Sequence, residues 1–185
     1  MIPHETPLPG PAADFAAGLA ARLPVLETAR LRLRAPVLAD SAAWAEIFCG
    51  PAGENLGGPF SREEAFTEFA ATCGLWLLRG HGLWTAEARD SGRVLGFVLI
   101  GFEPGDDEPE LGYLFLPEAE GRGYATEAAI AARDHALEVM GLPRLVSYIA
   151  PGNARSSAVA RRLGALREGL LDGAEVWRHH PKGPQ

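Results

Sequence analysis

Two glycines one residue apart, Gly121 and Gly123, lie between a predicted strand and a long segment typical of a helix. The first turn of a helix leaves backbone N–H groups unpaired and carries the positive end of the helix dipole, which suits a phosphate. Glycines let the backbone bend and approach a ligand closely, and Ala125 keeps a nearby position small. The segment therefore predicts a turn that binds a diphosphate, to which Arg122 could add a cation and Thr126 a hydroxyl.

Two common phosphate-binding motifs match this turn poorly. The Walker pattern G-x-x-x-x-G-K-[ST] requires a lysine that the turn does not have. The dinucleotide pattern G-x-G-x-x-G/A requires a third small residue where this chain has Thr126, and it belongs to a series of parallel strand–helix–strand units that the sequence does not predict. A nucleotide or dinucleotide binder is therefore the less favoured alternative.

The elements around the turn must position it, and they follow the order strand, two helices, three strands, helix, strand, helix and two strands. The three consecutive strands are expected at 83–88, 94–102 and 110–117, and a helix over 123–140 precedes a strand at 144–150. Only that helix requires a crossover, so its two flanking strands should be parallel and the other pairs antiparallel. The sequence predicts an α/β (α+β) fold with a mixed, mainly antiparallel sheet of six to seven strands.

Three local patterns indicate where elements begin. Residues 26–36 alternate leucine with arginine, which is typical of a half-exposed strand. Ser61 and Glu64 form an S-x-x-E capping box at the start of a second helix. Asn153 can cap a short helix that ends at Gly164.

The composition is that of an ordinary globular protein, with 47% hydrophobic and 22% charged residues in 185. No apolar run is long enough to span a bilayer and the start does not resemble a signal peptide, so we expect a cytoplasmic protein with no membrane partner. The net charge of −7 argues against a nucleic-acid partner, which needs a basic face. The two cysteines and the isolated pair His179 and His180 do not indicate a metal site.

The turn and the strand before it resemble the GNAT superfamily of N-acetyltransferases. The coenzyme A loop of that family, Q/R-x-x-G-x-G/A, is matched by residues 120–125, with Glu120 in place of Gln or Arg. The RimJ/RimL-like branch, which acetylates ribosomal-protein N-termini, runs E-[IL]-G-Y, a few apolar residues, Pro, then G-[KR]-G-[YF]-A-[ST]-E-A. Here those residues are 110–113, Pro117 and 121–128.

Two further segments carry the resemblance. Residues 26–34 resemble the opening strand of the branch, and Asn153, Ser156 and Gly164 resemble its N-x-x-S…G segment. Four matches in the right order make the resemblance far more specific than the glycine turn alone.

The resemblance implies one acetyltransferase domain over 25–179. An N-terminal arm that could contain a short helix (1–24) precedes it, and a frayed tail (180–185) follows. The resemblance also implies the GNAT fold, with helices on both faces of the sheet. Its central parallel pair is expected to splay apart at a bulge in the strand at 110–117.

The resemblance implies acetyl-CoA as cosubstrate and no metal. The pantetheine would pair, like an added strand, with backbone groups at 114–116, and the diphosphate would lie on 121–126. Asn153 would contact the cofactor from the next helix start, unless it serves only as an N-cap. The expected cofactor residues are Leu114, Phe115, Leu116, Gly121, Arg122, Gly123, Tyr124, Ala125, Thr126 and Asn153.

Acyl transfer from a thioester to an amine requires a neutral amine, a stabilised oxyanion and a proton for the departing thiolate. Glu110 is the candidate base, because a carboxylate beside an apolar strand can have a raised pKa. The alternative is that Glu110 is a solvated charge at a strand end. A backbone N–H near Leu114 or Phe115 is the candidate oxyanion donor.

The acid must differ from the one that many family members use. The tyrosine that many members use falls on Ala160 in this sequence. The resemblance therefore assigns the acid role to Ser156, with Tyr148 or Tyr124 as substitutes. As alternatives, Tyr124 would pack on the cofactor or in the core and Tyr148 would be an ordinary strand aromatic.

The function implied by the resemblance is acetyl transfer to a primary amine, either a protein N-terminus or a small molecule, by direct attack in a ternary complex. Loop 49–60 and the first two helices would flank the amine. A non-catalytic acyl-CoA binder or sensor is the main alternative. The sequence leaves the acceptor, the acyl chain length and the oligomeric state open, and a homodimer is compatible with it.

Overall fold

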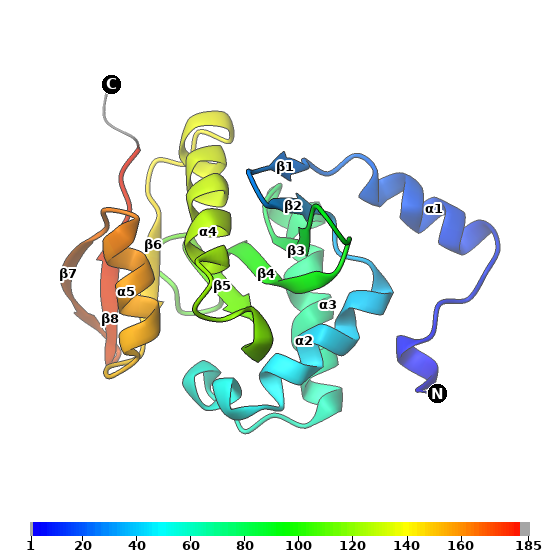
Figure 1. The fold of residues 1–185 in the computed structure, drawn as a ribbon, viewed down its shortest axis with the longest axis horizontal. Coiled ribbons are helices and arrows are strands. Elements are labelled where there is room, and N and C mark those ends of the chain that lie inside the picture. The colour runs from blue at the N-terminus through cyan, green and yellow to red at the C-terminus, as the bar shows by residue number, and fades with distance from the viewer. Residues whose placement is uncertain (1, 182–185) are drawn as a thin grey trace.

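The computed structural model describes residues 2–181, so the predicted tail at 180–185 lies largely outside the described residues. The helices are α1 (Pro11–Ala20), α2 (Ser41–Phe48), α3 (Arg62–Arg79), α4 (Tyr124–Asp134) and α5 (Ala154–Arg162). The strands, seen in Figure 1, are β1 (Leu26–Glu27), β2 (Leu31–Arg34), β3 (Leu83–Ala88), β4 (Val94–Gly101), β5 (Glu110–Phe115), β6 (Val146–Ile149), β7 (Leu166–Leu171) and β8 (Ala174–Arg178). Short 3-10 turns occupy Pro3–Glu5, Leu38–Asp40, Pro51–Leu56 and Pro117–Ala119, and a π-helical turn, His135–Val139, continues α4.

The strands form one sheet in the order β1-β2-β3-β4-β5-β6-β8-β7. β5 and β6 run parallel and the other neighbouring pairs are antiparallel, which confirms the predicted mixed sheet and its crossover. Over residues 2–181 the sheet has eight strands, because the single strand predicted at 26–36 is a hairpin. Thr28 closes its turn: the Thr28 N–H donates to the Leu31 carbonyl at 2.9 Å, and the Thr28 hydroxyl accepts the Leu31 N–H at 2.9 Å.

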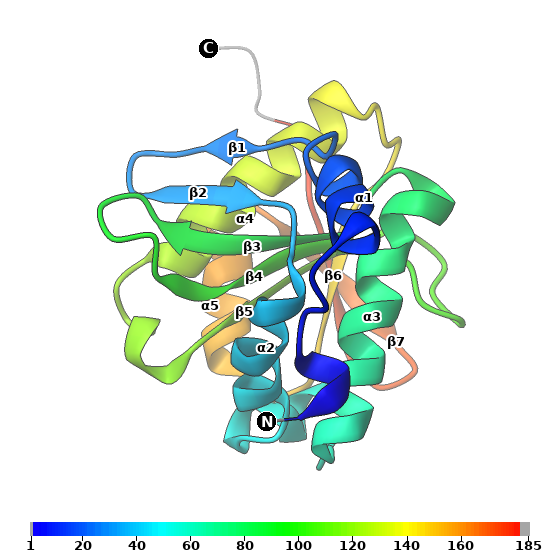
Figure 2. The same ribbon diagram turned by 90° about the vertical axis from the view of Figure 1, so that its right-hand side faces the viewer.

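Helices cover both faces of the sheet, as predicted (Figure 1 and Figure 2). On one face α4 packs through buried alanines such as Ala128 and Ala132, whose small side chains let the helix lie close to the strands. On the other face α2 and α3 enclose aromatic side chains, with the rings of Trp44 and Phe97 5.2 Å apart. Side chains of β5 pack into the hydrophobic clusters on both faces of the sheet, so this strand is packed between the two layers of helices.

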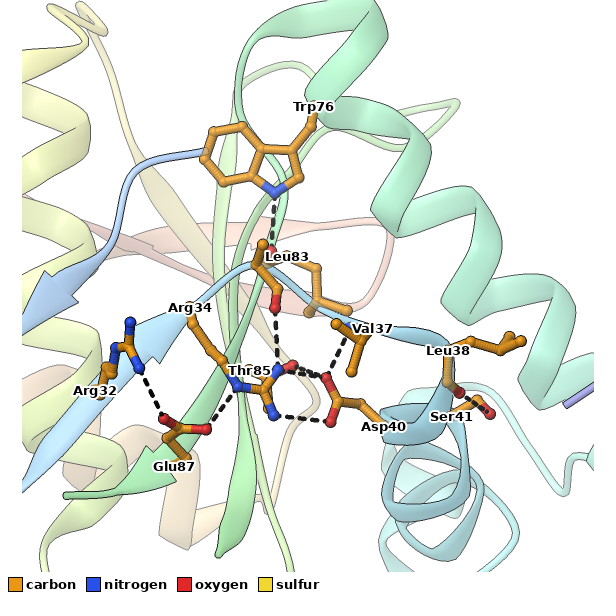
Figure 3. A network of polar contacts seen from close by, with 11 residues as sticks. Arg32, Arg34, Val37, Leu38, Asp40, Ser41, Trp76, Leu83, Thr85 and Glu87 are labelled. Atoms are coloured by element: carbon orange, nitrogen blue, oxygen red, sulfur yellow. Dashed lines mark hydrogen bonds and ion pairs between the residues drawn. The ribbon is translucent and has the colours of Figure 1, made fainter. Parts of the chain in front are cut away.

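A buried network of charges fixes the start of α2 against β2 and β3 (Figure 3). The Asp40 carboxylate, only 4% exposed, accepts bonds from the Arg34 guanidinium at 2.7 and 3.0 Å and from the Thr85 hydroxyl at 2.8 Å. Arg34 also donates to the Glu87 carboxylate at 2.6 Å. Loss of one partner would leave a buried charge uncompensated, so the network positions α2 and the segment that follows it.

The N-terminal region lies on the outside of this body. α1 has no buried side chain, and the preceding segment contacts α3 through two bonds of 2.7 Å between the Arg62 guanidinium and the Glu5 carboxylate. Within residues 2–181 we find no helix with the length and apolar character needed to cross a membrane.

Candidate active site

A cavity of about 1070 Å³ opens where β5 and β6 separate. Its other walls are the turn before α4, the first turn of α5 and the 3-10 segment after α2. The structure brings together in this cavity the predicted site residues Glu110, Leu114, Phe115, Gly121, Arg122, Gly123, Tyr124, Ala125, Thr126, Asn153 and Ser156.

Leu116 is the predicted site residue that the cavity does not include. Its side chain is buried in the core under α2, and its N–H donates to the Leu95 carbonyl of β4 at 2.9 Å. Backbone groups of a strand point alternately to its two neighbours, so Leu114 also bonds to β4. The groups that face the cavity are those of Phe115 and of Tyr113, which the sequence did not single out. The expectation of free backbone groups at Leu114 and Leu116 was wrong because of this alternation.

The turn before α4 has the conformation that a phosphate site needs. Gly121 and Gly123 have φ values of +70° and +80°, a left-handed region that strains residues with a Cβ. Gly123 is the N-cap of α4 and has no side chain to bond the first turn. The N–H groups of this turn therefore remain available at the cavity wall, and the arrangement fits a diphosphate.

A clamp that the sequence did not predict supports the turn. Glu127 of α4 accepts the Thr28 hydroxyl at 2.6 Å, the Arg30 N–H at 2.8 Å and the Arg30 Nε–H at 2.7 Å. Arg30 also donates to the Arg122 carbonyl at 2.9 Å. Arg30 and Glu127 both belong to segments that carry the family resemblance. Local sequence patterns do not reveal a contact between positions 97 residues apart, so the sequence could not pair them.

The predicted bulge in β5 was wrong. From Glu110 to Phe115 this strand keeps an unbroken register with β4. Towards β6, however, β5 has a single paired position, Glu110 with Val146, where the Val146 N–H donates to the Pro109 carbonyl at 3.0 Å. The strands therefore separate because pairing stops on the β6 side.

Two side chains stand where the next backbone bond would form. A regular parallel ladder would join the Tyr148 N–H to the Leu111 carbonyl, each two residues beyond the last bond. Instead the Tyr148 N–H donates to Glu110 Oε1 at 3.1 Å, and the Leu111 carbonyl accepts the Ser147 hydroxyl at 2.6 Å. Each half of the missing backbone bond is thus satisfied by a side chain.

The Glu110 carboxyl lies at the point of separation and is not the solvated strand end of the alternative interpretation. Burial raises the pKa of Glu110 from 4.5 to about 7, and the charges of Asp106 and Glu103 act in the same direction. The bond from the Tyr148 N–H opposes them by stabilising the carboxylate. A carboxyl with this pKa can exchange a proton near neutral pH.

The first turn of α5 carries the other predicted polar groups. Asn153 is an N-cap, since its Oδ1 accepts the Ser156 N–H at 3.1 Å. The Tyr113 hydroxyl reaches across the cavity from β5 and donates to the Ser156 carbonyl at 2.8 Å. Burial, together with the charge of Glu110, raises the pKa of Tyr113, so this phenol stays protonated.

The two tyrosines named as substitute acids differ in their surroundings. Tyr124, the first residue of α4, is buried in the core, with the Arg30 and Arg122 guanidinium groups 4.5 and 5.2 Å from its ring centre. Tyr148 lines the cavity, and burial raises its pKa. Of the two, only Tyr148 has a side chain that belongs to the cavity without being part of the core.

A family model described as an acetyltransferase (GNAT) domain matches residues 30–166. The chain belongs to the GNAT acetyltransferase family. A crystal structure of an acetyltransferase from Agrobacterium tumefaciens str. C58 is 37% identical to this GNAT chain, with 85% of this chain and 95% of that one covered and a TM-score of 0.81.

Two further proteins share less sequence identity with this chain. The N-acetyltransferase YnaD of Bacillus subtilis (strain 168), described as uncharacterized, is 32% identical over 83 residues. That match covers 45% of this chain and 49% of YnaD, so this chain spans about half the length of the relative. RimL, a ribosomal L7/L12 alpha-N-protein acetyltransferase solved in complex with coenzyme A, shares the fold with a TM-score of 0.70 at 20% identity, over 85% of this chain and 98% of RimL.

Glu120 is the position at which this GNAT chain departs from the family loop. Its carboxylate forms an ion pair with the Arg155 guanidinium in the first turn of α5, and both residues line the cavity. The side chains are 39% and 66% exposed, so the pair contributes little to stability. Its effect is electrostatic: Glu120 adds negative charge beside the turn and engages a nearby cation.

Proposed function

We propose that this chain is an acetyl-CoA-dependent N-acetyltransferase that acts on a primary amine by direct attack in a ternary complex. The observation that carries the proposal is one cavity containing both a turn that fits a diphosphate and a carboxyl, Glu110, with a pKa near 7. A simple coenzyme binder needs the turn but has no use for a base held at the separation of two strands.

The cofactor would occupy the side of the cavity that faces α4 and α5. N–H groups of residues 121–126 would bind the diphosphate, with Arg122 as a nearby cation. The backbone of Tyr113 and Phe115 would pair with the pantetheine as a strand does. Because the cap of α5 uses only Oδ1 of Asn153, its amide N–H groups could still donate to the cofactor.

Acetyl-CoA supplies the activated thioester. Glu110 would accept a proton from the incoming ammonium or amine, directly or through a water molecule. The Phe115 N–H, which faces the cavity, would donate to the oxyanion that develops at the acetyl carbonyl. The Ser156 hydroxyl would donate towards the sulfur as the thiolate leaves, with Tyr148 as the substitute.

The acceptor would approach from the segment after α2. Ile47, Ala52 and Leu56 give this wall an aliphatic surface, and Asn55 adds an amide. Such a wall suits a primary amine on a small or apolar body. The fold likeness to RimL supports the RimJ/RimL-like branch, with a protein N-terminus as one acceptor, and a small-molecule amine fits the same wall.

The experiment is an amine panel, including short peptides with free N-termini, incubated with acetyl-CoA and monitored by thiol release. We expect thiol release with at least one amine, together with calorimetric binding of acetyl-CoA. Binding without turnover on a broad panel would favour the acyl-CoA binder or sensor. Absence of binding by folded protein would refute the proposal.

A further inference from the structure

Ser147 is a buried hydroxyl at the point where β5 and β6 separate, and the chemistry proposed above gives it no role. The residue is 2% exposed, and its hydroxyl donates to the Leu111 carbonyl at 2.6 Å. Its Oγ also lies 2.9 Å from Nε2 of His179, a residue 3% exposed whose N–H donates to the carbonyl of Leu145, just before β6, at 2.9 Å. Ser147 is therefore held on one side by β5 and on the other by the residue that follows β8.

The direction of these bonds follows from counting protons. The one hydroxyl hydrogen of Ser147 is used towards Leu111, so His179 must donate Nε2–H to the Ser147 oxygen. His179 Nδ1 is then an acceptor, and it has no partner among residues 2–181. Burial lowers the pKa of His179 to about 4, and the charges of Arg133 and His180 act in the same direction. A neutral His179 with the proton on Nε2 is thus the state at neutral pH.

We propose that Ser147, oriented by His179, is a positioning residue that keeps β5 and β6 apart and keeps the Tyr148 N–H on Glu110. The Leu111 carbonyl accepts the Ser147 hydroxyl, whereas a continued ladder would give it the Tyr148 N–H. While Ser147 occupies it, Tyr148 is left to donate to the Glu110 carboxylate. The role of Glu110 as base, and hence the kinetic part of this inference, rests on the proposed function.

Removal of the Ser147 hydroxyl should let the strands pair one bond further. A buried carbonyl without a donor is costly, so the freed Leu111 carbonyl would take the Tyr148 N–H. The cavity would narrow at its inner end and Glu110 would lose its donor. The remaining charges that face Glu110, Asp106 and Glu103, both raise its pKa, so the pKa of Glu110 would increase further.

The kinetic test compares Ser147→Ala with Ser41→Ala. Ser41 is a matched control, because it is also 2% exposed and donates to a backbone carbonyl, that of Leu38, at 2.7 Å, but at the start of α2 (Figure 3). We expect Ser147→Ala to raise the KM for acetyl-CoA roughly fivefold and to move the acidic limb of the pH–rate profile up by roughly half a pH unit. Ser41→Ala should change neither. Equal behaviour of the two variants would overturn the proposal.

A second readout does not depend on turnover. The amide proton of Tyr148 should change its NMR shift as Glu110 titrates near pH 7 in the natural chain, and should stop doing so in Ser147→Ala. A chain that releases no thiol with any amine would refute the proposed function and leave this measurement intact. If the NMR shift of the Tyr148 amide proton did not change as Glu110 titrates in the natural chain, the role of Ser147 would be refuted and the proposed function would not.

The His179 variants keep the test open if Ser147→Ala does not fold. His179→Gln retains an N–H donor towards Ser147, whereas His179→Leu removes it. We expect His179→Gln to keep the natural titration of the Tyr148 amide and His179→Leu to weaken it. Two indistinguishable variants would show that His179 does not orient Ser147.

Discussion

The turn before α4 and the segment after α2 line the same cavity, but they are built in different ways. The first side, where we propose that the cofactor binds and which we call the cofactor side, uses mainly the backbone of a turn and of β5 within residues 110–126. The second, where we propose that the amine binds and which we call the acceptor side, consists of the Glu110 carboxyl and of four residues far from it in the sequence, Ile47, Ala52, Asn55 and Leu56. Backbone sites depend on conformation, whereas side-chain walls depend on residue identity. The acceptor side can therefore change without disturbing the cofactor side.

The largest expected effect tests whether Glu110 belongs to the acceptor side in function. Glu110→Gln should lower kcat/KM for the amine by roughly 100-fold or more at pH 7, because general base catalysis is lost. The KM for acetyl-CoA should change little. In the natural chain, kcat/KM should fall about tenfold per pH unit below about 7, as the base becomes protonated, and this limb should vanish in the variant. A parallel loss of acetyl-CoA binding in Glu110→Gln would contradict the assignment of Glu110 to the acceptor side.

The same substitution should stabilise the fold, but only at high pH. The pKa of Glu110 is about 7 in the folded chain against 4.5 ordinarily, so the folded state favours the protonated carboxyl. The stability that this protonation gives the fold is fully present below pH 4.5 and is lost as the pH rises through about 7. Glu110→Gln should therefore raise the free energy of unfolding at pH 8.5 by up to about 3 kcal/mol and leave it unchanged at pH 4. Urea unfolding at the two pH values measures this. A gain that is equal at both would show that the pKa of Glu110 is not raised.

The cofactor side is tested at Gly123, with Gly164 as control. Both have positive φ, +80° and +77°, but Gly164 ends α5 outside the cavity. Alanine at either position should cost about 1–2 kcal/mol of stability through left-handed strain. Only Gly123→Ala should also raise the KM for acetyl-CoA, roughly tenfold, with the amine KM unchanged. If both alanine variants lost acetyl-CoA binding, strain alone would account for it.

A smaller effect is expected on the acceptor side at Asn55. Asn55→Ala should raise the KM for the amine roughly threefold by removing a hydrogen-bonding group, with the KM for acetyl-CoA unchanged. Glu54→Ala, an exposed neighbour outside the cavity lining, is the control and should change neither constant. Steady-state kinetics with both substrates varied distinguishes the outcomes. A change in the KM for acetyl-CoA would contradict the assignment of Asn55 to the acceptor side.

The smallest effect concerns Glu120. Glu120→Gln removes a negative charge beside the diphosphate turn and releases Arg155, so the KM for acetyl-CoA should fall about twofold at low salt. The difference should disappear at high ionic strength. Glu118→Gln, which removes an exposed charge outside the cavity lining, should have less effect. A higher KM in Glu120→Gln would mean that the ion pair helps to shape the site.

The sequence predicted most of the strands, the parallel pair and the glycine turn, because each depends on local periodicity or on one crossover. It missed features in which distant segments meet. Residues 26–36 form a hairpin because the Thr28 hydroxyl and N–H satisfy Leu31 at the turn, which alternation alone does not reveal. The sequence also placed Leu116 in the site, although the side of a strand that bonds its neighbour is fixed only once the register is known.

The pair of Ser147 and His179 was beyond sequence reasoning for a topological reason. The C-terminal hairpin inserts β8, not β7, next to β6. That order brings the residue after β8 beside β6, 32 positions away in the chain. The sequence offered His179 only as one of two adjacent histidines, and their spacing carries no information about a hydroxyl on another strand.

The single paired position between β5 and β6 divides the sheet into two plates, β1 to β5 and β6 with β8 and β7. β4 and β5 are joined by six paired positions and β6 and β8 by four, so each plate is stiffer than the joint between them. A pivot of one plate against the other would turn about the pair of Glu110 and Val146. Such a hinge motion would change the width of the cavity most at its outer end while the Glu110 carboxyl, on the axis, stays nearly still. The cleft could thus admit a long cofactor without displacing the proposed base.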